Sequence, residues 1–136
     1  SGYKWADASA SACHILYNLL VFVDMTHLQI SGRTVDVISY EPLDERWRSF
    51  GWSVRTINGH DFEAIISNSM DIPFEKGKPS VIIADTVKSK GLGFAEAKVS
   101  YHYWKATPEE MVQAEHDLDA IEKELNEEME RSSSHE

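Results

Sequence analysis

Three short strand-like runs, each beside turn-forming residues, constrain the fold of this chain most. The runs cover residues 19–23, 53–57 and 80–84. The first and the third end in the acidic residues Asp24 and Asp85, while Asn58-Gly59 follows the second and Gly77-Lys78-Pro79 precedes the third. Runs of this kind are typical of strands that are buried on both faces of a sheet.

Helical patterns separate these runs. Apolar residues recur at spacings of three and four over residues 42–50 and 62–70, and Gly51 stands where the first of these helices is expected to end. Residues 5–17 are rich in small and apolar side chains and predict a helix packed closely on a neighbour. Strands that alternate with helices favour right-handed crossovers and a parallel sheet covered on both faces, so the expected class is α/β.

The clearest helix signal lies near the end of the chain. Thr107-Pro108-Glu109-Glu110 is a capping box, and the apolar positions after it form one stripe. The stripe consists of Met111, Ala114, Leu118, Ile121 and Leu125. It predicts that an amphipathic helix over residues 107–130 packs on its own chain or on a partner helix. Residues 1–106 are expected to form the α/β domain, and the polar residues 131–136 a disordered tail.

Charge and composition exclude several classes of function. A formal net charge of -10 leaves no basic excess to neutralise the phosphates of a nucleic acid. Most of the acidity lies between Glu109 and Glu130, so the part before residue 108 can still hold an anionic cofactor. Cys13 is the single cysteine, and no run approaches the roughly 20 apolar residues of a membrane helix. We expect a cytoplasmic protein that binds neither nucleic acid nor membrane.

A series of segments, taken in order, resembles consecutive segments of transketolases. They are Leu20-Val21-Phe22-Val23-Asp24, His27-Leu28-Gln29-Ile30-Ser31-Gly32-Arg33-Thr34, Glu41-Pro42-Leu43, Trp47-Arg48-Ser49-Phe50-Gly51-Trp52, Asn58-Gly59-His60-Asp61-Phe62, Gly77-Lys78-Pro79 with Val81-Ile82-Ile83-Ala84, Thr86-Val87-Lys88-Ser89-Lys90-Gly91, and Tyr101-His102. No single segment is diagnostic, but the ordered set is specific for the family. The resemblance implies part of a thiamine diphosphate-binding domain, downstream of its Gly-Asp-Gly turn, with a partial three-layer α/β/α fold around a parallel sheet.

The resemblance also implies thiamine diphosphate and Mg²⁺ as cofactors. In the family an Asn side chain and a backbone carbonyl two residues later bind Mg²⁺, which prefers oxygen ligands. These positions fall on Thr26 and Leu28, and Ile30 falls where the family places an apolar contact beneath the cofactor rings. Two interpretations stay open for each of these side chains. Thr26 either ligates the metal, directly or through a water, or only turns the chain. Ile30 is either the apolar contact beneath the cofactor rings or an ordinary core residue. His27 is interpreted as a surface or packing residue.

The second cofactor region implied by the family is the loop after the last strand. Lys88 takes the position of a Lys that meets the cofactor, and His102 that of a His that meets both diphosphate and sugar. A Lys supplies charge against the diphosphate, and a His, the expected catalytic residue, donates to an oxygen and helps to move a proton. Tyr103-Trp104 stand where the family has a Gly, so two bulky rings in place of the smallest residue are expected to fill the channel beside His102. The alternative for Lys88 is an ordinary solvated loop residue.

Several family groups have no counterpart in this sequence. The Gly-Asp-Gly turn would precede Ser1, and the Glu of a pyrimidine-binding domain would come from elsewhere. The first hypothesis is a transketolase fragment or subunit, inactive alone, that transfers a two-carbon ketol unit between sugar phosphates. A complementary transketolase segment or pyrimidine-domain subunit would complete it as a homo- or hetero-oligomer. The alternative is a non-catalytic remnant or interaction module that retains the fold, and a sugar-phosphate synthase of the same cofactor superfamily comes third.

Overall fold

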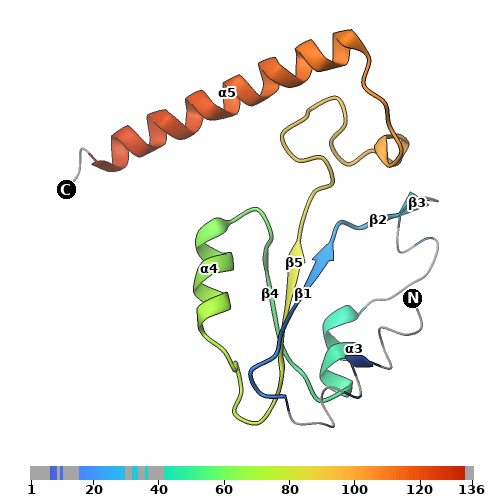
Figure 1. The fold of residues 1–136 in the computed structure, drawn as a ribbon, viewed down its shortest axis with the longest axis vertical. Helices are drawn as coiled ribbons and strands as arrows, with labels where there is room; N and C mark the ends of the chain where they lie inside the picture. The colour runs from blue at the N-terminus through green and yellow to red at the C-terminus, as the bar shows by residue number, and fades with distance from the viewer. Residues whose placement is uncertain are drawn as a thin grey trace. The chain divides into compact units, whose positions relative to one another are not determined.

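The structure, a computed structural model, describes residues 7, 8, 10, 16–29, 32, 33, 36 and 42–133. Its elements are β1 (Leu20–Met25), β2 (Leu28–Gln29), β3 (Gly32–Arg33), α3 (Leu43–Ser49), β4 (Ser53–Asn58), α4 (Phe62–Met70), β5 (Ser80–Asp85), the 3₁₀ helix η1 (Val99–Tyr101) and α5 (Pro108–Ser133) (Figure 1). Contacts divide the chain into two compact units, residues 1–27 with 32–86, and residues 28–31 with 87–136. None of the helices in the described ranges has the length and apolar character needed to cross a membrane.

A parallel sheet in the order β1-β5-β4 forms the centre of the first unit. Leu20 of β1 and Ser53 of β4 both pair with Ser80 of β5, one on each side. The central strand is the most buried, since Val81 and Ile82 are fully buried. The three strands, the parallel sheet and the α/β class predicted from the sequence are confirmed.

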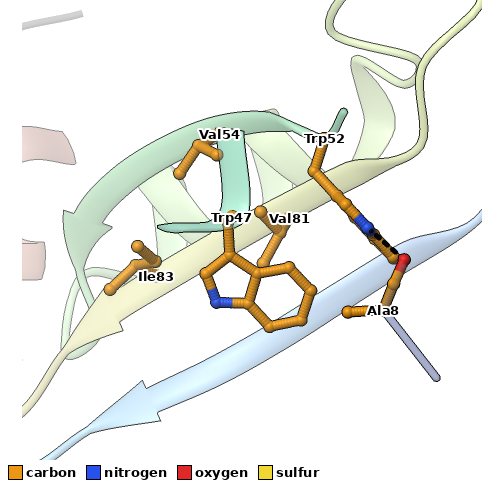
Figure 2. Close-up of a cluster of buried hydrophobic side chains, with 6 residues drawn as sticks. All are labelled: Ala8, Trp47, Trp52, Val54, Val81 and Ile83. Carbon is orange, nitrogen blue, oxygen red and sulfur yellow. Dashed lines mark hydrogen bonds between the residues drawn. The ribbon is translucent and has the colours of Figure 1, made fainter. Parts of the chain in front are cut away.

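The core of the first unit lies on the α3 face of the sheet. Trp47 of α3 packs with Val81 and Ile83 of β5, and its ring lies 5.0 Å from that of Trp52 in an edge-to-face arrangement (Figure 2). The indole nitrogen of Trp52 donates to the carbonyl of Ala8 at 2.8 Å, so a distant part of the chain is tied to this core. Buried aromatic and β-branched side chains therefore hold α3 on the sheet.

Polar contacts attach α4 to the opposite face of the sheet. Val54 of β4 points into the core, so the next residue, Arg55, points to the other side. The Arg55 guanidinium donates to Asn68 Oδ1 at 3.0 Å and pairs with Asp71 Oδ2 at 2.7 Å. It also lies 4.1 Å from the centre of the Phe74 ring. Helices thus cover both faces of the sheet, as the resemblance implies.

Helix α5 begins at the predicted capping box. Glu110 N donates to Thr107 Oγ1 at 3.2 Å, and Thr107 N donates to the Glu110 carboxylate at 2.9 Å. The helix continues past the expected end at residue 130 and ends at Ser133. Its last side chains bond to carbonyls one turn earlier: Arg131 to Glu127, Ser132 to Glu128 and Ser133 to Met129. Residues 131–133 are therefore helical, and the other domain boundaries stay a prediction.

Candidate functional site

The carboxyl ends of the three strands meet at one edge of the sheet. Met25 of β1 and Asn58 of β4 both pair in register with Asp85, the last residue of β5. In open α/β sheets, ligands bind outside the carboxyl ends of the strands. This edge is therefore the candidate site of the first unit.

Two side-chain contacts join the end of β1 to the end of β5. His27 Nε2 donates to Asp85 Oδ1 at 2.8 Å, and the Thr86 hydroxyl donates to the Asp24 carboxylate. His27 also has a φ of 58°, in the left-handed region that residues with a β-carbon seldom adopt. Its role is therefore to bridge two strands at a turn, which is more specific than the surface or packing role expected.

Gly59 brings the end of β4 close to the end of β5. Its N–H donates to the carbonyl of Asp85 at 2.7 Å. A β-carbon at this position would overlap the methyl group of Thr86 and would lie 3.0 Å from Ala84 Cβ. The edge therefore requires the absence of a side chain here, and the reason is close approach of the two strands.

The first predicted cofactor loop is described only in part. Thr26 directly follows β1 and is partly buried, and Leu28 begins β2 and is also partly buried. Thr26 belongs to the first unit and Leu28 to the second. Ile30 lies outside the described residues. The roles of all three toward metal and cofactor stay predictions.

The second predicted cofactor loop, which contains Lys88, is compact. The carbonyl of Lys88 accepts from Ala97 N at 3.0 Å and so closes the loop on itself. Ser89 and Ala97 have φ values of 58° and 55°, and Gly91 has 95°. Left-handed backbone at non-glycine residues is maintained only where the surroundings hold it, and it is concentrated at functional sites. The Lys88 side chain is partly buried at the base of this loop.

Helix α5 anchors the glycines of the same loop. Asp117 Oδ2 accepts from Gly93 N at 3.0 Å, and its other oxygen accepts from Gln113 at 2.7 Å. The hydrogen bond from Gln113, followed by that from Gly93, lowers the pKa of Asp117. A β-carbon on Gly91 would lie 3.3 Å from Ile121 Cδ1, so the backbone also packs tightly on the predicted apolar stripe.

His102 follows η1 and is partly buried. Its N–H donates to Val99 O at 2.9 Å, and its ring lies 5.0 Å from that of Tyr103 in an edge-to-face arrangement. Tyr103 is 79% exposed, whereas Trp104 packs on the rings of Phe94 and Tyr101. The two rings that follow His102 therefore differ in surroundings, and Trp104 is held by neighbouring aromatic residues.

Sequence reasoning found the loops but missed most of the contacts within them. The bridge from His27 to Asp85 and that from Thr86 to Asp24 join residues far apart in the sequence. A signal was present, because an Asp closes two of the three strand-like runs. Carboxyl ends of parallel strands lie at one edge, so those two acids were candidates to meet polar partners there.

The side chains at this edge of the sheet are compatible with Mg²⁺ but do not form a complete set of ligands. Asp24 and Asp85 bring carboxylate oxygens, and Thr26 and Thr86 bring hydroxyls, which are the oxygen donors that Mg²⁺ prefers. No group of three or more His, Cys, Asp or Glu residues in the described ranges is arranged to hold a metal ion. These residues fit a partial coordination sphere, so a metal bound here would need further ligands.

Comparison with known proteins identifies the family. The family described as "Transketolase, thiamine diphosphate binding domain" matches residues 2–128. The 6-deoxy-6-sulfo-D-fructose transketolase subunit of a Clostridium species (strain MSTE9) is 38% identical over 108 residues, which is 79% of this chain and 39% of that protein. One of the subunits of the apulose-4-phosphate transketolase of Phocaeicola vulgatus is 35% identical over 129 residues, which is 92% of this chain and 46% of that protein.

Solved structures agree with this assignment. The transketolase of Campylobacter jejuni matches with a TM-score of 0.74 and 28% identity, over 85% of this chain and 18% of that chain. This chain therefore spans less than half the length of each of these relatives. It belongs to the family of transketolase thiamine diphosphate-binding domains.

Proposed function

We propose that this chain is part of a thiamine diphosphate- and Mg²⁺-dependent enzyme that transfers a two-carbon ketol unit between sugar phosphates. One observation carries the proposal beyond family membership. Among the described residues, the non-glycine positions with left-handed backbone are His27, Ser89 and Ala97. All three lie in or beside the two loops that the resemblance assigns to the cofactor. Left-handed backbone of this kind is concentrated at functional sites, which supports a binding function for these loops.

Thiamine diphosphate, when bound, supplies the carbanion chemistry. Lys88 has the role of a positive charge against the diphosphate. His102 has the role of a donor to a phosphate or sugar oxygen, and it moves a proton as the transferred group changes partner. The bridges at the sheet edge hold the loop of Thr26 in place for the metal.

A partner chain is part of the proposal. The two relatives described above are each named as a subunit. We infer that a complementary chain with the pyrimidine-binding domain supplies the Glu of that domain, and that this chain alone is inactive toward sugar phosphates. The assembly works in the cytoplasm under this proposal.

A non-catalytic interaction module is the second candidate. Thr26 stands in place of the Asn that the family uses for the metal, and the described residues contain no complete cluster of metal ligands. In this alternative the fold and its partner surface are retained without cofactor binding. The two candidates differ in whether an assembled complex binds thiamine diphosphate.

Lys88→Ala is expected to weaken thiamine diphosphate binding by about tenfold, because a charge-assisted contact to a diphosphate is lost. The measurement is calorimetric titration of thiamine diphosphate with Mg²⁺ into this chain mixed with its complementary pyrimidine-domain chain. Lys105→Ala is the matched control, since Lys105 is exposed and lies outside the closed loop. Removal of the metal by a chelator is expected to abolish the heat of thiamine diphosphate binding. Absence of binding by the unaltered complex would favour the interaction module.

Thr26→Asn is expected to strengthen Mg²⁺ binding about tenfold in the same complex, because an amide oxygen reaches a metal that the shorter hydroxyl meets less well. Thr26→Val is expected to weaken it by a similar factor. The measurement is a Mg²⁺ titration at saturating thiamine diphosphate. If both variants bind Mg²⁺ as the unaltered complex does, Thr26 only turns the chain.

A further inference from the structure

Three hydrogen bonds converge on the carboxylate of Glu110. Its Oε1 accepts from the Tyr101 hydroxyl at 3.0 Å, and its Oε2 accepts from the indole nitrogen of Trp104 at 3.0 Å. Oε2 also accepts from the backbone N–H of Thr107 at 2.9 Å. Only the last of these bonds belongs to a capping box, so Glu110 does more than begin α5.

Aromatic packing reinforces the two side-chain bonds. The rings of Tyr101 and Trp104 lie 5.3 Å apart, and Phe94 contacts both at 5.8 and 5.6 Å. The two contacts of Tyr101 are edge-to-face and that between Phe94 and Trp104 is tilted, and such close ring contacts restrict how the rings reorient. Tyr101 and Trp104 are therefore fixed to each other and to the first turn of α5. We call Glu110, Tyr101, Trp104 and Phe94 the clamp.

The clamp brackets His102. Tyr101 directly precedes His102, and Trp104 follows it with only Tyr103 between. Both flanking positions are anchored, so the short segment between them has few ways to turn. The rings of His102 and Tyr103 are presented together, 5.0 Å apart, and Tyr103 is the more exposed of the two.

The charge state of Glu110 agrees with this arrangement. The hydrogen bond from Thr107 N, followed by that from Trp104, holds the pKa of Glu110 below its ordinary value. The hydrogen bond to Glu110 raises the pKa of Tyr101. Both shifts favour an ionised carboxylate facing a protonated phenol, which is the protonation state in which Glu110 accepts all three hydrogen bonds.

We propose that Glu110 is a positioning residue that orients His102 through Tyr101 and Trp104. This inference rests on the proposed function, in which His102 meets the diphosphate and the sugar. It assigns to the first turn of α5 a role in the site that capping alone does not require. In this proposal Trp104 helps to orient His102, whereas its size alone predicted that it fills the channel beside His102.

The alternative is that Glu110 only caps α5, and Thr107→Ala distinguishes the two. This variant removes the hydroxyl that accepts from Glu110 N at 3.2 Å and leaves the three acceptor contacts of Glu110 in place. Glu110→Gln is the conservative variant, because its amide oxygen still accepts from Trp104 and Thr107 while its amide group donates to the Tyr101 oxygen. Glu110→Ala removes all three contacts.

The experiment uses the chain in complex with its complementary pyrimidine-domain chain. The readouts are the NMR signal of the His102 imidazole and the affinity for thiamine diphosphate with Mg²⁺. For Glu110→Ala we expect the signal to move toward that of an unstructured His and the affinity to fall by about tenfold, as when a partner that orients a ligand-binding residue is lost. Glu110→Gln is expected to leave both the His102 signal and the affinity as they are in the unaltered complex. Thr107→Ala is expected to leave the His102 signal unchanged while it reduces the helix content.

The inference is overturned if Glu110→Ala leaves the His102 signal unchanged, or if Thr107→Ala shifts it equally. Should Glu110→Ala fail to fold, Trp104→Phe decides, because it keeps the ring contacts and removes the N–H donor. A shifted His102 signal in that variant supports the clamp, and an unshifted one contradicts it. If the unaltered complex does not bind thiamine diphosphate, the proposed function fails, while the NMR readout still tests the clamp.

Discussion

Replacement of Trp52 by alanine is expected to lower the free energy of unfolding by about 3–5 kcal/mol, the range typical of truncating a buried aromatic residue. Trp52 is 2% exposed and packs edge-to-face on Trp47. Its removal leaves a cavity on the α3 face of the sheet and also removes the donor to the carbonyl of Ala8. The measurement is urea unfolding followed by circular dichroism.

Trp52→Phe separates the two contributions. The phenyl ring keeps most of the packing but cannot donate, so the buried carbonyl of Ala8 loses its partner at a cost of about 1–3 kcal/mol. Val112→Ala on α5 is the control, because Val112 is 67% exposed and its truncation is expected to change the free energy of unfolding by less than about 0.5 kcal/mol. If Trp52→Phe and Trp52→Ala lower the free energy of unfolding equally, the volume of the ring contributes little to stability at this position.

Gly59→Ala is expected to cost about 1–3 kcal/mol in the free energy of unfolding, because the new methyl group overlaps Thr86 where β4 and β5 end. The overlap acts on the same edge that carries the Asp24 and His27 bridges, so cofactor binding by the assembled complex is expected to fall as well. Urea unfolding measures the first effect, and calorimetric titration measures the second.

A second substitution tests the cause of this loss. Thr86→Ser removes the overlapping methyl group and keeps the hydroxyl that donates to Asp24. The Gly59→Ala/Thr86→Ser pair is therefore expected to regain part of the lost free energy, with a coupling of about 0.5–3 kcal/mol. Gly93→Ala is the control, since its nearest contact would be an ordinary 3.6 Å to Asp117. Purely additive effects of Gly59→Ala and Thr86→Ser would contradict the overlap as the cause.

The sequence was a good guide to elements whose signal is local. The strand-like runs predict β1, β4 and β5, and the apolar spacings predict α3 and α4, because burial on one or two faces determines which residues are apolar. The capping box at Thr107 predicts the start of α5 for the same local reason. The end of α5 was less predictable, since a polar tail carries no apolar periodicity.

Contacts between distant residues could not be predicted in this way. Alternation of strands and helices does not say that β5 lies between β1 and β4, so it does not reveal that His27 meets Asp85. The resemblance to a family located the loops of Thr26 and Lys88 but not the partners of their side chains. Glu110 was recognised as a cap, and its bonds to Tyr101 and Trp104 depend on how the chain turns between η1 and α5.

The position of β5 at the centre of the sheet has a consequence for synthesis on the ribosome. β1 and β4 are made first, yet neither pairs with the other, and both take their register from β5. Within the described sheet, β1 and β4 can therefore take this register only after residue 85 has left the exit tunnel. Pairing across such sequence separations is slow, and exposed strand edges promote aggregation during the delay. The edges of β1 and β4 that pair with β5 are thus expected to be exposed to aggregation until β5 has been made.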